Sequence, residues 1–164
     1  MMHKNRLFVK ILRLRVFLRD IPYFAGLFTK MNYWLVKSEP SVYSWEQFLK
    51  DGKTCWDGVR NYAARMHLNG MKKGDLVMYY HSREGLEVVG TAKVVKESYP
   101  DPTTDDDRWV AVDLKPHKSL KKPVPLSEMK KVKKLENIGL IRIGRLSVMP
   151  LTKTEFDTIL KMGN

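Results

Sequence analysis

The sequence predicts one α+β domain, a small mixed β-barrel or strongly bent sheet with short peripheral helices. The chain of 164 residues is long enough for one compact domain and too short for two ordinary ones. Hydrophobic residues at 43% and charged residues at 29% are typical of a chain that folds around a core. From Met31 onward, short β-branched and aromatic runs separated by turn residues outnumber the helical patterns.

The first part of this region predicts one strand and two short helices. Residues 33–36 are β-branched and aromatic, and Pro40 ends this strand soon after. Residues 44–47 form a capping box, which predicts a helix to about residue 50. A second helix is expected over residues 62–68, closed by the turn pair Asn69-Gly70.

The middle of the chain predicts a β-hairpin. Residues 76–80 are an apolar run, and residues 86–96 form a longer run in which Gly90 indicates a bulge. Residues 82–85 between them have the composition of a hairpin loop. Two adjacent antiparallel strands are therefore expected here.

The last third predicts a loop, a strand and a terminal helix. Residues 99–107 are expected to form the loop, and residues 109–114 alternate as a strand. The proline-rich stretch 116–125 is expected to hold only edge or irregular structure. A capping box at residues 152–155 predicts a helix through about residue 161.

The net charge of +12 favours polyanionic partners such as nucleic acid or an anionic membrane surface. Half of this charge lies in residues 1–30, which we separate from a domain over residues 31–164. The N-terminal segment fits a mis-annotated start before Met31, a structured extension or a basic amphipathic targeting segment. No stretch approaches the ~20 apolar residues of a membrane span, so we expect no integral membrane contact. The expected location is cytoplasmic, or nuclear in a eukaryote.

Several kinds of chemistry lack their sequence signatures. The single cysteine, Cys55, permits no intramolecular disulfide and is expected to be an ordinary packed thiol in a reducing compartment. The four histidines are scattered without ligand spacing, so no metal is expected. Because the glycine-rich phosphate loops and the nucleophile elbow are absent from the sequence, no cofactor is expected either.

Two stretches are harder to explain as scaffold. Residues 34–40 place Lys37 and Ser38 where a strand ends at a proline, a common position for site residues. Residues 56–65 gather two arginines, an asparagine and two aromatics at a helix entrance, where free N–H groups suit a phosphate or a base edge. Together they predict a pocket with aromatic walls and a few polar groups, as an unstacked base requires.

These stretches belong to a longer series of motifs that resembles the EVE domain family. The resemblance runs in order from about residue 33 to about residue 160. It implies a PUA-like fold and a non-catalytic module that binds a modified nucleobase, usually a cytosine derivative, in DNA or RNA. The motifs that carry it are WLVKSEP (34–40), WDGVRNY (56–62), YHS (80–82), VG (89–90), YPDPT (99–103) and RLSVMP (145–150).

The resemblance suggests roles for individual side chains. Base-binding roles are expected for Trp34, Lys37, Ser38, Asn61, Tyr62, Arg65, Tyr80, His81, Ser82, Tyr99, Asp101, Trp109 and Ser147. Phosphate-binding roles are expected for Arg60, Arg145, Lys72 and Lys73, with lysines in residues 130–134 adding long-range attraction.

Structural alternatives stand beside some of these roles. Trp34 and Trp109 could be core residues, and Asp101 could cap its own turn. Ser147 could cap the backbone, and the lysines of residues 130–134 could be a solvated face.

Two other functions remain open. A small amidohydrolase acting on acylated nucleosides could use Lys37, Ser38 and Glu39, although adjacent residues of an extended strand point to opposite faces. A general basic protein that docks on RNA is the second alternative. A monomer is expected in each case.

Overall fold

The computed structural model describes residues 30–164, so the expectations for the N-terminal extension lie outside the described residues. Six strands form one sheet in the order β2-β5-β4-β3-β1-β6. The strands are β1 (Tyr33–Ser38), β2 (Thr54–Trp56), β3 (Leu76–His81), β4 (Glu87–Pro100), β5 (Val110–Pro125) and β6 (Val148–Leu151). The helices are α2 (Trp45–Asp51), α3 (Tyr62–Gly70), α4 (Leu126–Met129), α5 (Gly139–Arg142) and α6 (Lys153–Met162), with a 3₁₀ turn, η1 (Lys133–Leu135).

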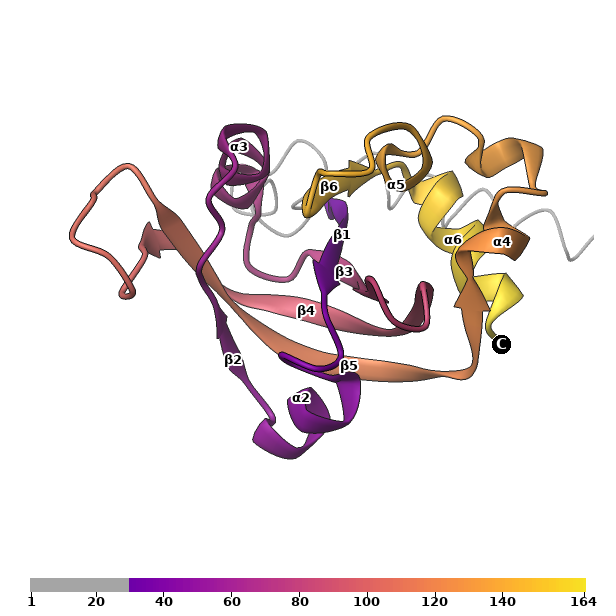
Figure 1. The fold of residues 1–164 in the computed structure, drawn as a ribbon, viewed down its shortest axis with the longest axis horizontal. Helices are drawn as coiled ribbons and strands as arrows, with labels where there is room; N and C mark the ends of the chain where they lie inside the picture. Colours follow the sequence, from indigo (N-terminus) through magenta and orange to yellow (C-terminus); the bar gives the residue numbers. More distant parts are fainter. Residues whose placement is uncertain (1–29) are drawn as a thin grey trace, which may run out of the picture. The chain divides into compact units, whose positions relative to one another are not determined.

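The sheet is mixed and open. Strands β1 and β3 pair in parallel, while the other neighbours are antiparallel. Hydrogen bonding ends at β2 on one edge and β6 on the other, so the predicted α+β class is confirmed but the sheet does not close into a barrel. Repeated register shifts between β4 and β5 bend this long pair, which crosses the domain in Figure 1 with α2 on one side and α3, α5 and α6 on the other.

Both sequences predicted as capping boxes start helices, although at Ser44 the Gln47 side chain bonds Asp51 and the box is not closed. The Ser44 hydroxyl accepts from the Gln47 N–H, and α2 ends at Gly52 in the left-handed region (φ 69°). At α6, Thr152 and Glu155 exchange side-chain and backbone hydrogen bonds. These helix boundaries are fixed locally, which explains why the sequence predicted them.

One detail of the predicted elements was wrong, and the edge position of the proline-rich stretch was confirmed. Gly70 lies inside α3 rather than forming its cap, and Met71 is the capping residue with φ −70°. A Cβ at Gly70 would lie 3.1 Å from the Trp34 indole, so close packing explains this glycine. The proline-rich stretch forms the second half of β5, and it does so at an edge because β2 pairs with β5 only along residues 112–114.

The strands β2 and β6 were not predicted. They have three and four residues, too few for a periodic pattern to show, and β6 contains Pro150 on the outer edge of the sheet. No helix within residues 30–164 is long and apolar enough to cross a membrane.

The core is organised around Tyr79, which is fully buried in β3. Its ring contacts Trp45, Phe48 and Trp56 at centroid distances of 5.2 to 5.6 Å. Its hydroxyl donates to the Tyr43 carbonyl oxygen at 2.8 Å, and burial raises the pKa of Tyr79 to about 12. One side chain thus joins α2, β2 and the loop after β1.

Trp45 from α2 packs over Gly90, where the bulge predicted for β4 is found. The register of β4 against β5 shifts between Val88 and Gly90. The Trp45 indole N–H donates to the Ser119 hydroxyl on β5 at 3.0 Å. A Cβ at Gly90 would lie 2.2 Å from the indole ring, so only glycine fits here.

We expect Gly90→Ala to lower the free energy of unfolding by about 2 kcal/mol, because Trp45 must move off the strand. Gly144→Ala is the matched control, since a Cβ there meets nothing within 4 Å. Urea unfolding followed by tryptophan fluorescence measures both. Equal stability of the two variants would contradict the packing of Trp45 on this bulge.

Candidate functional site

A first cleft of about 610 Å³ opens where β1 ends, beside β2 and the loop that leads to α3. Its walls include an aromatic ring, two hydroxyls, an amine and two carboxylates. The side chains that carry this chemistry are Lys37, Ser38, Glu39, Trp56, Asp57 and Ser147. We call this the first cleft throughout.

Lys37 and Ser38 both line the first cleft although they are adjacent in sequence. Both belong to β1, which ends at Ser38, and their side chains bond to different segments, as expected for adjacent residues of an extended strand. The Ser38 hydroxyl donates to the Tyr43 carbonyl at 2.7 Å and holds that turn. The Lys37 amine donates to the Gly144 carbonyl at 2.9 Å, and burial lowers the pKa of Lys37.

Trp56 forms the aromatic wall of the first cleft. It is the last residue of β2, is 9% exposed and meets the Tyr79 ring edge-on at 82°. The core therefore fixes its position on one side. Asp57 comes next and is exposed, so its carboxylate is available at the mouth.

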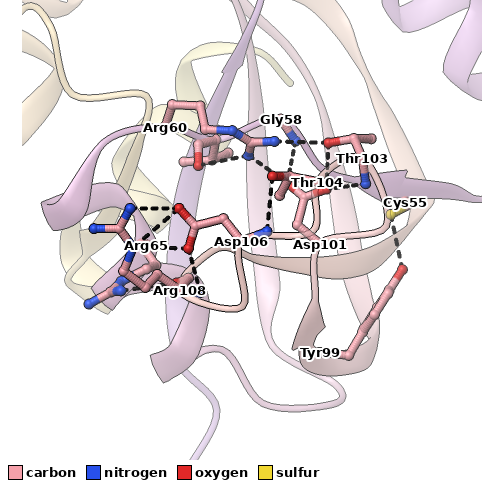
Figure 2. Close-up of polar contacts among 11 residues, drawn as sticks. Cys55, Gly58, Arg60, Arg65, Tyr99, Asp101, Thr103, Thr104, Asp106 and Arg108 are labelled. Carbon is pink, nitrogen blue, oxygen red and sulfur yellow. Dashed lines mark hydrogen bonds and ion pairs between the residues drawn. The ribbon is translucent and has the colours of Figure 1, made fainter.

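The loop after Trp56 is held by the buried carboxylate of Asp101 (Figure 2). Asp101 Oδ2 accepts from the Gly58 N–H at 2.9 Å and from Arg60 at 2.7 Å. Asp101 Oδ1 accepts from the Thr103 N–H and hydroxyl at 2.8 and 2.6 Å. Burial by itself raises the pKa of Asp101, but the hydrogen bonds from Thr103, Arg60 and Gly58 outweigh it and lower the pKa to about 2.

An arginine and aromatic cluster lies at the entrance of α3, and of its members only Arg60 also lines the first cleft. Tyr62 and Trp109 pack at 5.2 Å, and Arg60 and Arg65 lie over Trp109 and Tyr62 at 5.6 and 5.2 Å. Arg108 donates to the Tyr62 hydroxyl and pairs with Asp106 at 2.7 Å (Figure 2). These guanidinium groups already have aromatic or acidic partners.

A second cleft of about 500 Å³ lies on the other side of the β1 end. Lys37, Glu39 and Ser147 line both clefts. The remaining walls come from the hairpin after β3, from α4 and from the segment around α5. They include Tyr80, Ser82, Arg83, Leu86, Leu126 and Arg145.

The structure brings together only part of the predicted site. Lys37, Ser38, Arg60 and Ser147 line the first cleft, and Tyr80, Ser82 and Arg145 line the second. Neither cleft is lined by Trp34, Asn61, Tyr62, Arg65, Lys72, Lys73, His81, Tyr99, Asp101 or Trp109.

The residues outside the clefts have structural partners. Trp34 is buried, and its indole N–H donates to Asp75 at 2.8 Å. Asn61 caps α3 by accepting from the Ala64 N–H at 2.9 Å. His81 accepts from the Trp45 N–H at 3.1 Å, and burial lowers its pKa, so it is neutral. The Tyr99 hydroxyl donates to Asp113 at 2.5 Å.

Lys72 pairs with Glu97 at 2.9 Å on the surface, and the Lys73 N–H donates to the same carboxylate. Because solvent screens this exposed ion pair, it contributes little to the free energy of unfolding. Both lysines lie at the turn before β3, and neither contributes to a cleft wall.

The sequence argument missed Tyr43, Trp56 and Asp57 as cleft residues. Trp56 and Asp57 stand in the WDGVRNY motif, but the arginines and the asparagine of that motif drew the functional assignment. Trp56 could have been identified as an aromatic residue that ends a short strand two residues before Gly58. Cys55 is half-buried in the same wall, near the Tyr99 hydroxyl at 3.0 Å, and burial raises its pKa.

Within residues 30–164, no group of His, Cys, Asp and Glu is arranged to hold a metal ion. The carboxylates that line the first cleft are hydrogen-bond acceptors, and the Lys37 amine is a donor. This mixed edge, beside one aromatic ring, suits a flat polar heterocycle.

We expect Asp101→Asn to lower the free energy of unfolding at pH 7 by about 2 kcal/mol, since the pKa of Asp101 falls from 3.8 to about 2 on folding. A lowered pKa means that the ionised carboxylate stabilises the fold above about pH 4, and that this contribution disappears as the pH falls toward 2. The difference between wild type and variant should shrink over that window. Asp105→Asn, at an exposed position of the same loop, is the control. A difference independent of pH would refute the role of the charge.

Comparison with known proteins places this architecture in a family. The EVE domain family matches residues 32–162. Thymocyte nuclear protein 1 of Mus musculus is 38% identical over an alignment that covers 80% of this chain and 73% of the relative.

Solved structures agree. A protein of Agrobacterium tumefaciens is similar with a TM-score of 0.80 and 43% identity, covering 81% of this chain and 93% of its own. The human THYN1 protein, solved in complex with 5-methylcytosine containing DNA, is similar with a TM-score of 0.75 and 35% identity, covering 81% of this chain and 98% of its own. The resemblance noted from the motifs is confirmed over nearly all of the described residues, and the chain belongs to the EVE domain family.

Proposed function

We propose that this chain binds a modified nucleobase, a cytosine derivative in DNA or RNA, in the first cleft and releases it unchanged. The observation that carries the proposal is that Trp56 and the polar end of β1 line the same cleft. The human THYN1 protein, a structural relative, was solved with 5-methylcytosine containing DNA, which supports the same ligand class here. A cytosine extruded from a strand is flat and presents both donors and acceptors along one edge.

The polar groups of the first cleft complement that edge. The cytosine amino group donates hydrogen bonds, and Asp57 and the lone pairs of the Ser38 hydroxyl can accept them. The Ser38 proton is committed to the Tyr43 carbonyl, so this hydroxyl acts toward a ligand as an acceptor. The ring nitrogen and carbonyl of cytosine accept, and Lys37 retains donors beyond the one that bonds Gly144.

The apolar walls account for recognition of the modification. Stacking on Trp56 should contribute roughly 1–3 kcal/mol. Val42 and Val59 lie along the same cleft and offer apolar surface to a small substituent. A buried methyl group is worth about 1 kcal/mol, so selectivity over unmodified cytosine should be graded rather than absolute.

The contacts of Lys37 and Ser38 favour binding over the amidohydrolase alternative. A serine nucleophile needs a base that accepts its proton, but the Ser38 proton points to a backbone carbonyl. The Lys37 amine also donates to a carbonyl, and Glu39 pairs with Arg83 at 2.8 Å. None of the three is arranged as a nucleophile and base pair.

Calorimetry of the full chain with short oligonucleotides containing unmodified, 5-methylated, 5-hydroxymethylated or acetylated cytosine tests the proposal. One modified form should bind several-fold tighter than unmodified cytosine, and mass spectrometry should show the ligand unchanged. Trp56→Ala should weaken this binding about tenfold or more, because the stacking surface is lost. Trp56→Phe should weaken it less, since it keeps an aromatic face.

Thermal unfolding of each variant separates loss of the cleft from loss of the fold, and Ser38→Ala offers a milder change at the polar edge. Product formation that Lys37→Ala abolishes would establish the enzyme instead. Equal, salt-sensitive binding of every oligonucleotide, unaffected by Trp56→Ala, would reduce the protein to a basic docking module.

A further inference from the structure

We propose that the second cleft holds the nucleotide adjacent to the modified base, so the ligand is a nucleic-acid strand and not a free nucleoside. This inference rests on the proposed function of the first cleft. It concerns the side chains of the second cleft and another part of the ligand, namely the phosphodiester and the neighbouring nucleoside.

The two clefts are side by side. Lys37, Glu39 and Ser147 belong to the walls of both, so the end of β1 is a shared partition between them. The Lys37 N–H donates to the Ser147 carbonyl at 2.9 Å, which fixes the segment before β6 against β1 and keeps the partition in place. A strand with one base in the first cleft can reach the second cleft by passing over this partition.

The two clefts differ in charge. In the first cleft, Arg60 pairs with Asp101 and Glu39 pairs with Arg83, so the Asp57 carboxylate remains. In the second, Arg83 pairs with Glu39. Arg145 is exposed, and among residues 30–164 no carboxylate lies within ion-pair distance of it. The second cleft therefore carries the uncompensated positive charge.

The second cleft carries positive charge, and the first cleft carries a carboxylate. A nucleotide strand likewise alternates anionic phosphates with uncharged bases that have hydrogen-bond donors. Carboxylates suit the amino group of a base, whereas a free guanidinium suits a phosphate oxygen, which it can bind through two parallel N–H groups. The Lys37 amine stands between the two clefts, where the phosphate that links two nucleotides would pass.

The second cleft is also apolar enough for a sugar or a base. Leu86, Leu126 and Leu140 line it, and Leu86 is 45% exposed. Tyr80 lies at its base and is 2% exposed, and burial raises the pKa of Tyr80 to about 12, so the ring stays neutral. A phosphate alone would not need these walls, but a nucleotide would cover them.

The test compares three ligands by calorimetry with the full chain: 5-methyl-2′-deoxycytidine, a trinucleotide with 5-methylcytosine at its centre, and the unmodified trinucleotide. The modified trinucleotide should bind about tenfold tighter than the nucleoside. Arg145→Ala should weaken trinucleotide binding about five- to tenfold, lower its salt dependence by about one charge and leave nucleoside binding unchanged.

Arg142→Ala is the matched control, because it removes the same charge from an exposed arginine of α5 that lines neither cleft. It should behave as wild type. Leu86→Ser, which removes exposed apolar surface from the second cleft, should weaken trinucleotide binding as well.

The outcomes separate this inference from the proposed function. Equal affinities for nucleoside and modified trinucleotide, or equal effects of Arg145→Ala and Arg142→Ala, would overturn the inference and leave the first cleft as a nucleoside site. Equal affinities for modified and unmodified trinucleotides that still depend on Arg145 would support the second cleft and overturn base selectivity. Absence of binding by all three ligands would overturn both.

Discussion

The buried carboxylate of Asp101 is the constraint on which the first cleft depends. Each of its oxygens accepts two hydrogen bonds, one set from the loop before α3 and the other from the loop between β4 and β5. A buried charge is tolerated only when it is satisfied in this way. The Gly58 N–H can reach it because Gly58 adopts φ 69°, a conformation that favours glycine. Trp56 precedes this anchor by two residues, so the aromatic wall is fixed from the core on one side and from Asp101 on the other.

The position of both clefts follows from the parallel pairing of β1 and β3. Ser38 lies opposite His81 in that register, so the two strands end at the same place. Side chains that follow the ends of parallel strands converge, and here they meet the segment before β6 and the loop after β2. A ligand at this point contacts four segments that are far apart in the sequence. That arrangement gives one strand end two neighbouring surfaces, of which the second carries more positive charge.

What the sequence could and could not predict follows from the range of the interactions. Contacts within four residues determine where α2 and α6 begin, after Ser44 and Thr152. The capping patterns at these two positions could therefore be recognised in the sequence. The bulge at Gly90 was visible, but its partner Trp45 was not, because 45 residues separate them in the chain. Trp34 and Asn61 have side chains that could bind a base, but Trp34 bonds Asp75 and Asn61 caps α3. These contacts depend on the folded chain, so the sequence alone could not distinguish them from ligand-binding roles. Lys37 and Arg145 line the clefts and lie in motifs close to strand ends, and the binding roles expected for them stay predictions.

An open sheet leaves two strands with unpaired backbone groups, which could pair with another copy of the chain. Both edges carry the features that oppose such pairing. Past residue 114, β5 contains three prolines and the exposed side chains of Lys115, Lys118, Lys121 and Lys122, while β6 is four residues long and includes Pro150. Proline lacks the donor that an incoming strand requires, and lysines repel a second copy of the same edge. The prolines that make this part of the sequence hard to interpret as a strand thus oppose edge-to-edge aggregation of a sheet that never closes.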